Sequence, residues 1–162
     1  MPAPSLSIIM NINNKLNIED LFNLALQNQK ENNLNDAKNL YKKILKLQPE
    51  FIEAHKNLGL VYQKSGEIDK AKKHYEEAIK INPNLVIVQY NLALIFEQVG
   101  EDIKAQTCYE KIIENNPNIP DVHNNLGLLF QKLGKKNKQM NVMKKQLKLI
   151  QNMQMHIIIL EH

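Results

Sequence analysis

The chain has 162 residues, of which 43% are hydrophobic and 23% are charged, values that are ordinary for a globular protein with a buried core. Its single cysteine excludes an internal disulfide framework and a cysteine-rich zinc site, and favours a reducing, cytoplasmic setting. No apolar run reaches the roughly 18 residues of a membrane-spanning helix, so we expect no membrane segment. The formal net charge is +4, but six lysines face one acid in 135–162, so residues 1–134 are nearly neutral. A neutral body argues against a nucleic-acid-binding surface.

The first element is predicted to begin near residue 18. Residues 1–16 contain two prolines and an asparagine-rich stretch, and we expect them to form a mobile leader. Asn17 suits the N-cap of a helix, and Asp20 stands three residues later, where a capping-box partner is needed.

From this point to residue 134 one pattern recurs every 34 residues. Its columns are leucine followed by a small residue (Leu24, Leu58, Leu92, Leu126), alanine (Ala37, Ala71, Ala105), tyrosine (Tyr41, Tyr75, Tyr109) and proline (Pro49, Pro83, Pro117). Within each repeat the apolar residues fall at helical spacing in two runs. Gly66, Gly100 and Gly134 stand between the runs, where a turn requires a positive φ, and the prolines end the second run. The pattern predicts an all-α stack of helix hairpins.

This pattern resembles the tetratricopeptide repeat family. The resemblance covers three repeats and the first helix of a fourth, at 18–51, 52–85, 86–119 and 120–134. It implies a right-handed superhelical solenoid of antiparallel helix hairpins, whose first helices line a concave groove. It also implies a non-catalytic scaffold that binds protein or peptide partners and needs no cofactor.

One further column consists of asparagines that each precede a repeated leucine, namely Asn23, Asn57, Asn91 and Asn125. An amide both donates and accepts hydrogen bonds, so a ladder of amides can pair with the backbone of an extended peptide. The column resembles the asparagine ladder in the repeat arm of O-linked N-acetylglucosamine transferases. That resemblance implies further groove residues at Leu60, Leu94, Gln63, Lys64 and Lys132. Two other interpretations stay open: the amides bond within the repeat, or the column only reflects an asparagine-rich composition.

The residues that could carry chemistry have structural interpretations. His55 and His123 occupy the slot where the family often has tryptophan, so we expect them to be packing residues. His74 follows two lysines and is expected to be exposed, and Cys108 is expected to be an inert thiol. The sequence lacks a G-x-G-x-x-G motif, a P-loop and a nucleophile elbow, so we predict neither an enzyme nor a metal site.

The pattern stops after Gly134. Alanine, tyrosine, alanine and proline are expected at four positions that instead hold Gln139, Met143, Gln146 and Gln151. Residues 135–162 are thus an atypical Lys- and Met-rich tail. One hypothesis is a basic helix that covers the end of the stack, and a variant of it has the tail contact a membrane or a nucleic acid.

The hypothesis that we favour is that the tail is an out-of-frame translation. A reading frame shifted by one base joins the third base of each codon to the first two bases of the next codon. From Lys138 onward, codons permitted in this frame encode the missing second helix of the fourth repeat, its terminal proline and the Asn-Leu-Gly of the next repeat. All fall in the 34-residue phase. Four letters are forced: Glu across Met140–Asn141 and Met143–Lys144, and Ala across Met153–Gln154 and Met155–His156. The frame would slip in the adenine-rich codons of 135–138.

These observations predict a scaffold that holds a partner segment in its groove. The alternative that the asparagine column favours is the substrate-recruiting arm of a glycosyltransferase-like protein whose catalytic domain lies outside this chain.

Overall fold

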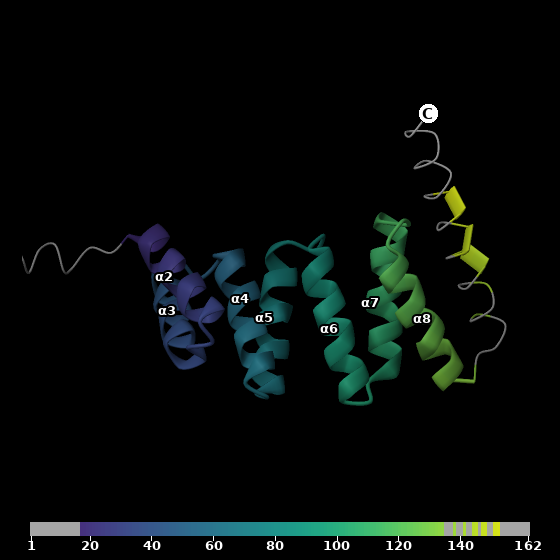
Figure 1. The fold of residues 1–162 in the computed structure, drawn as a ribbon, viewed down its shortest axis with the longest axis horizontal. Coiled ribbons are helices and arrows are strands. Elements are labelled where there is room, and N and C mark those ends of the chain that lie inside the picture. The colour runs from purple at the N-terminus through teal and green to yellow at the C-terminus, as the bar shows by residue number, and fades with distance from the viewer. Residues whose placement is uncertain are drawn as a thin grey trace, which may run out of the picture. The chain divides into compact units, whose positions relative to one another are not determined.

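The computed structural model describes residues 17–134 and, in the tail, residues 138, 141, 144, 145, 147, 148, 151 and 152. The leader predicted at 1–16 lies outside the described residues, and so do most residues of the predicted tail. Between residues 17 and 134 every element is a helix, as predicted. The helices are α2 (Ile18–Lys30), α3 (Leu34–Leu47), α4 (Ile52–Lys64), α5 (Ile68–Ile81), α6 (Val86–Gln98), α7 (Asp102–Asn115) and α8 (Pro120–Lys132) (Figure 1).

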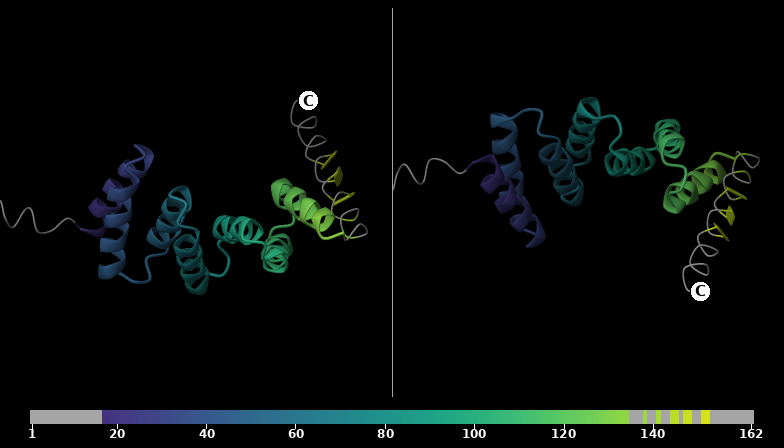
Figure 2. Two further views of the ribbon diagram at one scale, coloured as in Figure 1. Left: turned by 90° about the horizontal axis from the view of Figure 1, so that it is seen from below. Right: turned by 90° about the horizontal axis from the view of Figure 1, so that it is seen from above.

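The helices belong to two compact units, Met1–Asn84 and Leu85–His162. In the first unit α2 pairs with α3 and α4 pairs with α5, while α3 packs against α4. In the second unit α6 pairs with α7, and α7 packs against α8. The two views of Figure 2 show the paired helices side by side within each unit. The described part is therefore a series of helix hairpins with the predicted 34-residue period, the architecture of a repeat solenoid.

The helix ends follow the predicted local chemistry. The backbone N–H of Asp20 donates to Asn17 Oδ1 at 2.8 Å, and the N–H of Asn17 donates to Asp20 Oδ2 at 3.4 Å. The predicted capping box is therefore confirmed. The second helices α3, α5 and α7 each end two residues before a repeated proline, since the residue before proline disfavours helical geometry.

The hairpin turns need one residue in the left-handed region. Gly66, Gly100 and Gly134 have φ of 74°, 77° and 67°, as predicted. In the first hairpin Asn32 stands in the same column with φ 63°. Asparagine tolerates this conformation better than other side chains do, so the turn forms without glycine.

The tyrosine column fills the space beside the small residues. Tyr41, Tyr75 and Tyr109 are fully buried. A Cβ atom added to Gly59 would lie 2.6 Å from a ring carbon of Tyr75, closer than carbon atoms pack. The two helices of the α4–α5 hairpin therefore approach closely at Gly59.

The repeated leucines are not all buried. Leu58, Leu92 and Leu126 are core residues, whereas Leu24 is 39% exposed. Leu24 is exposed because no described helix packs against α2 from the preceding side. None of the described helices is long and apolar enough to span a bilayer.

Candidate functional site

Each of the three complete hairpins contains an equivalent hydrogen bond between its second helix and its first helix. The tyrosine hydroxyl donates to a side chain 12 residues earlier: Tyr41 to Gln29 at 2.8 Å, Tyr75 to Gln63 at 3.0 Å, and Tyr109 to Glu97 at 2.5 Å. Burial, followed by the Glu97 hydrogen bond, raises the pKa of Tyr109, so the phenol stays protonated and donates. Gln63, which we predicted to face a ligand, is thus bonded to its own hairpin.

In the first unit the asparagine column has unused hydrogen-bonding groups. Asn23 on α2 is exposed, and Asn57 on α4 is only 9% exposed. Neither amide makes a hydrogen bond to another residue that the structure describes. The half-buried Leu60 and the exposed Lys64 lie on the same helix as Asn57. The two amides are therefore not committed to a hydrogen bond with another described residue.

In the second unit the column is bonded internally at one position. The Nδ2 of Asn125 on α8 donates to the hydroxyl of Tyr90 on α6 at 2.8 Å. This bond joins the first helices of two consecutive hairpins. Asn91 is half-buried and takes part in a contact of its own. The Asn125 bond links two repeats, so it differs from the bonding within one repeat that the sequence left open.

The other predicted groove residues of the second unit differ in their surroundings. Leu94 is half-buried, and the Nζ of Lys132 forms an ion pair of 2.6 Å with Asp102 at the start of α7. Our sequence reasoning missed Tyr90 and Ile87, which is 67% exposed. The equivalent positions of the other repeats hold an acid, namely Glu19, Glu53 and Asp121. This departure from the repeat pattern could have identified Ile87 from the sequence.

The histidines pack against the hairpins. His55 and His123 are buried, and the Nε2 of each lies 2.8 Å from a proline carbonyl six residues earlier. The prediction that His74 is exposed is wrong. Its ring stacks on Tyr62 at 5.5 Å, and its Nδ1 lies 3.1 Å from the Nδ1 of His55. Burial, together with nearby His55 and Lys73, lowers the pKa of His74 to about 4.

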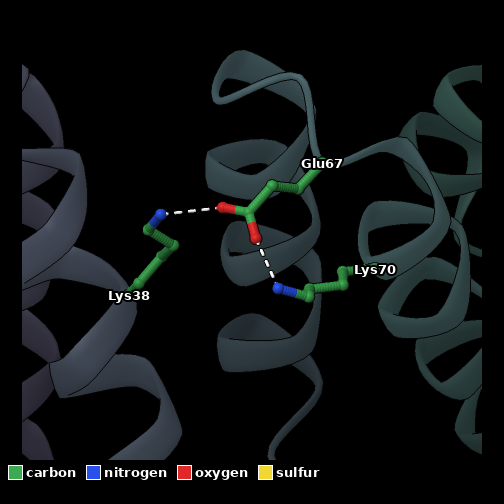
Figure 3. A network of polar contacts seen from close by, with 3 residues as sticks. All are labelled: Lys38, Glu67 and Lys70. Atoms are coloured by element: carbon green, nitrogen blue, oxygen red, sulfur yellow. Dashed lines mark hydrogen bonds and ion pairs between the residues drawn. The ribbon is translucent and has the colours of Figure 1, made fainter.

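A charged network joins the two hairpins of the first unit. The carboxylate of Glu67, just before α5, accepts from Lys38 on α3 at 2.8 Å and from Lys70 at 2.6 Å (Figure 3). These two hydrogen bonds lower the pKa of Glu67 to about 2. One carboxylate against two ammonium groups leaves the network with a net charge of +1, and because its members bond one another we interpret it as a structural link.

Chemistry at the remaining reactive groups has little support. Cys108 is half-buried, and burial raises the pKa of its thiol, which reduces the thiolate needed for nucleophilic attack. Within the described residues no three His, Cys, Asp or Glu side chains gather as a metal site would require.

Comparison with known proteins agrees with this geometry. Three models of the tetratricopeptide repeat match residues 52–85, 87–119 and 108–140. A crystal structure of MamA has a TM-score of 0.79 at 27% identity, over 84% of this chain and 80% of that one. MamA 41-end from Desulfovibrio magneticus RS-1 gives 0.76 at 19% identity, over 84% and 77%. A tetratricopeptide repeat protein from Parabacteroides merdae ATCC 43184 gives 0.78 at 21%, over 82% and 53%. The last two likenesses concern the fold alone. A search of curated proteins gave no match.

Proposed function

We propose that this chain, which belongs to the tetratricopeptide repeat family of protein-interaction scaffolds, binds an extended segment of a partner protein along its first helices. The observation that carries the proposal is the pair of unused amides at Asn23 and Asn57 in the first unit. The scaffold is proposed to be non-catalytic and to act in the cytoplasm.

The amide of Asn57 gives the proposal its physical basis. Asn57 is 9% exposed, and its amide makes no hydrogen bond to another described residue, so only solvent or a ligand can pair with it. A peptide backbone offers an N–H and a C=O, which match the acceptor and the donors of an amide. A bound extended segment would therefore supply the hydrogen bonds that the described residues do not give to Asn57.

The neighbouring side chains would set a preference. Leu60 provides apolar surface beside Asn57, and Lys64 provides a positive charge one turn further along α4. We infer that the first unit prefers a segment with an apolar residue and an acid. In the second unit, Asn91, Leu94 and Asn125 would bind less tightly, because a ligand must first displace the bond between Asn125 and Tyr90.

The test begins with a phage-displayed library of random peptides of about 12 residues, selected on the full chain. The double variant Asn23→Ala, Asn57→Ala should raise the Kd of the selected peptides about tenfold to thirtyfold, since two hydrogen bonds of about 1 kcal/mol each are lost. Circular dichroism should remain unchanged. The matched control is Asn35→Ala, Asn39→Ala, at two exposed asparagines of the second helix α3. Equal Kd values for the double variant and the parent would overturn the proposal.

The asparagine column also favours the second candidate, a substrate-recruiting arm of a glycosyltransferase-like protein. Both candidates predict peptide binding through Asn23 and Asn57. The discriminating measurement is the sequence of the gene downstream of this chain. A catalytic domain encoded there supports the recruiting arm, and a gene that encodes only further repeats supports the scaffold.

A further inference from the structure

We propose that α8 is built to receive a second helix that carries a tyrosine at position 143 and a hydrogen-bond donor at position 142. We further infer that the reading frame shifted by one base after Gly134 encodes this helix. The proposal concerns the end of the second unit and is independent of peptide binding.

The α4–α5 hairpin shows what a first helix requires of its second helix. Tyr75 lies over Gly59 so closely that a Cβ there would be 2.6 Å from the ring. The same tyrosine donates its hydroxyl to Gln63 at 3.0 Å. A glycine and a glutamine four residues apart on the first helix thus form the receiving side of one buried tyrosine.

Helix α8 has the same receiving side. Gly127 and Gln131 stand 68 residues, two repeats, after Gly59 and Gln63. Gly134 has φ 67°, the turn conformation that precedes a second helix in the earlier hairpins. The residue at the tyrosine position is Met143, whose thioether has no proton to donate to Gln131.

The histidines add an independent observation. A carbonyl only accepts, so the Nε2 of His55 donates to the oxygen of Pro49, and the Nδ1 of a neutral His55 is an acceptor. In the α4–α5 hairpin His74 lies 3.1 Å away and supplies the donor. His123 makes the same bond to Pro117. Position 142 lies two repeats after His74, so by analogy with the α4–α5 hairpin we expect a donor for this Nδ1 to come from that position.

His123 lacks that donor among the residues that the structure describes. It is 1% exposed, and its Nδ1 is buried without a hydrogen-bond partner there. The residue at position 142 is valine, which has no polar hydrogen. His123 also lines a cavity of about 290 Å³, together with Ile113, Glu114, Leu126, Asn141 and Lys145. Groups of α7, α8 and the described tail residues thus line a pocket beside His123 that is open to solvent.

The shifted frame supplies what α8 requires. A codon for Asn141 ends in C or T, and a codon for Val142 begins with GT, so the shifted residue at position 142 is cysteine or arginine. Both side chains can donate to His123. Cys108 occupies this column in the preceding hairpin, and tyrosine is among the residues permitted at position 143. Neither a donor nor a tyrosine stands there in the written frame.

The experiment compares the written chain with a full-length frame-shifted chain that has the shifted residues from position 139 onward. A docked second helix should raise Tm by about 5 °C or more, because the end of a repeat array is stabilised by each added interface. Gly127→Ala should lower Tm of the frame-shifted chain by several degrees, since the new Cβ meets a tyrosine ring. In the written chain the same change should leave Tm unchanged or raise it, because alanine favours a helix over glycine.

Three results would overturn the proposal. The first is an equal Tm for the two chains, and the second is a loss of Tm of the same size from Gly127→Ala in both. The third is a transcript whose sequence keeps the written frame through the codons of 135–162. Light scattering measures whether the written chain forms a dimer. If it does, and if Gly127→Ala dissociates that dimer, the glycine and glutamine of α8 bind a second copy of the chain and the proposal is overturned.

Discussion

Helix α4 in the first unit and helix α8 in the second unit carry almost the same sequence, His-Lys-Asn-Leu-Gly-Leu at 55–60 and His-Asn-Asn-Leu-Gly-Leu at 123–128. Both histidines are buried and bond a proline carbonyl. Only His55 has a described partner for its second ring nitrogen, which is His74 on α5. The bond to the proline carbonyl thus forms between the first helix and the residues just before it, while the second helix decides whether the other ring nitrogen has a partner.

The largest expected effect comes from blocking the α4–α5 contact. Gly59→Val should reduce the free energy of unfolding by about 2–3 kcal/mol, because the new side chain would overlap Tyr75. Urea unfolding followed by circular dichroism measures it. The matched control is Gly66→Ala, which meets no atom within 4 Å and should cost only about 1 kcal/mol for its φ of 74°. A larger loss for Gly66→Ala would mean that the turn, and not the ring contact, dominates the stability of this hairpin.

The next effect compares the tyrosine bonds of the two units. Tyr109→Phe should cost about 2 kcal/mol, since it removes a donor from the carboxylate of Glu97, whereas Tyr75→Phe should cost about 1 kcal/mol with its neutral acceptor Gln63. The midpoint of urea unfolding reports both changes. Adding Glu97→Gln to Tyr109→Phe should recover part of the loss, because no carboxylate is then left without its donor. Equal losses in the two units would contradict a charge-assisted bond at Glu97.

Between pH 4 and 6.5 we expect stability to depend on pH through His74, the second histidine packed into the α4–α5 hairpin. The pKa of His74 is about 4 in the folded state and 6.5 unperturbed, so between these values the unfolded state binds more protons. Stability should therefore be complete above pH 6.5 and fall as the pH decreases towards 4. We expect a loss on the order of 1 kcal/mol after solvent screening is taken into account. In His74→Gln the urea midpoint should change less with pH between 4 and 6.5 than in the parent chain. If the midpoint of the variant depends on pH as strongly as that of the parent, His74 does not cause the pH dependence.

The smallest effect concerns the link between the hairpins of the first unit. Lys38→Met removes the first of the two hydrogen bonds that hold the pKa of Glu67 near 2, so that pKa should rise towards its usual value of 4.5. NMR titration of the Glu67 carboxyl carbon measures the shift. The change in Tm should be at most about 2 °C and should vanish in high salt. Lys46→Met, at an exposed lysine of the same helix, should leave the pKa of Glu67 unchanged.

The period of the sequence predicts the backbone well because each column repeats a local cause. The glycine column fixes the turns at Gly66, Gly100 and Gly134, and Asn17 with Asp20 fixes the first cap. These features depend on neighbours within a few residues, which a single sequence displays directly.

The side-chain environments are harder to predict, because a column does not show what packs against each of its members. Leu24 is exposed and Leu58 is buried, although both precede the same kind of small residue. Asn125 bonds Tyr90, 35 residues away, and no other repeat has a tyrosine in that column. The periodic pattern assigns one role to all four asparagines, whereas the contacts give them different ones.

Tyr75 on the second helix contacts both Gly59 and Gln63 on the first helix, so the two helices of a hairpin depend on each other. This dependence limits where such a gene can gain or lose repeats. A recombination break near Pro83 keeps the two helices of a hairpin together and preserves these contacts. A break near Gly66 separates the glycine and the glutamine from their tyrosine. Duplication or deletion in whole units that end at the prolines should therefore yield folded descendants more often than exchange at the glycines.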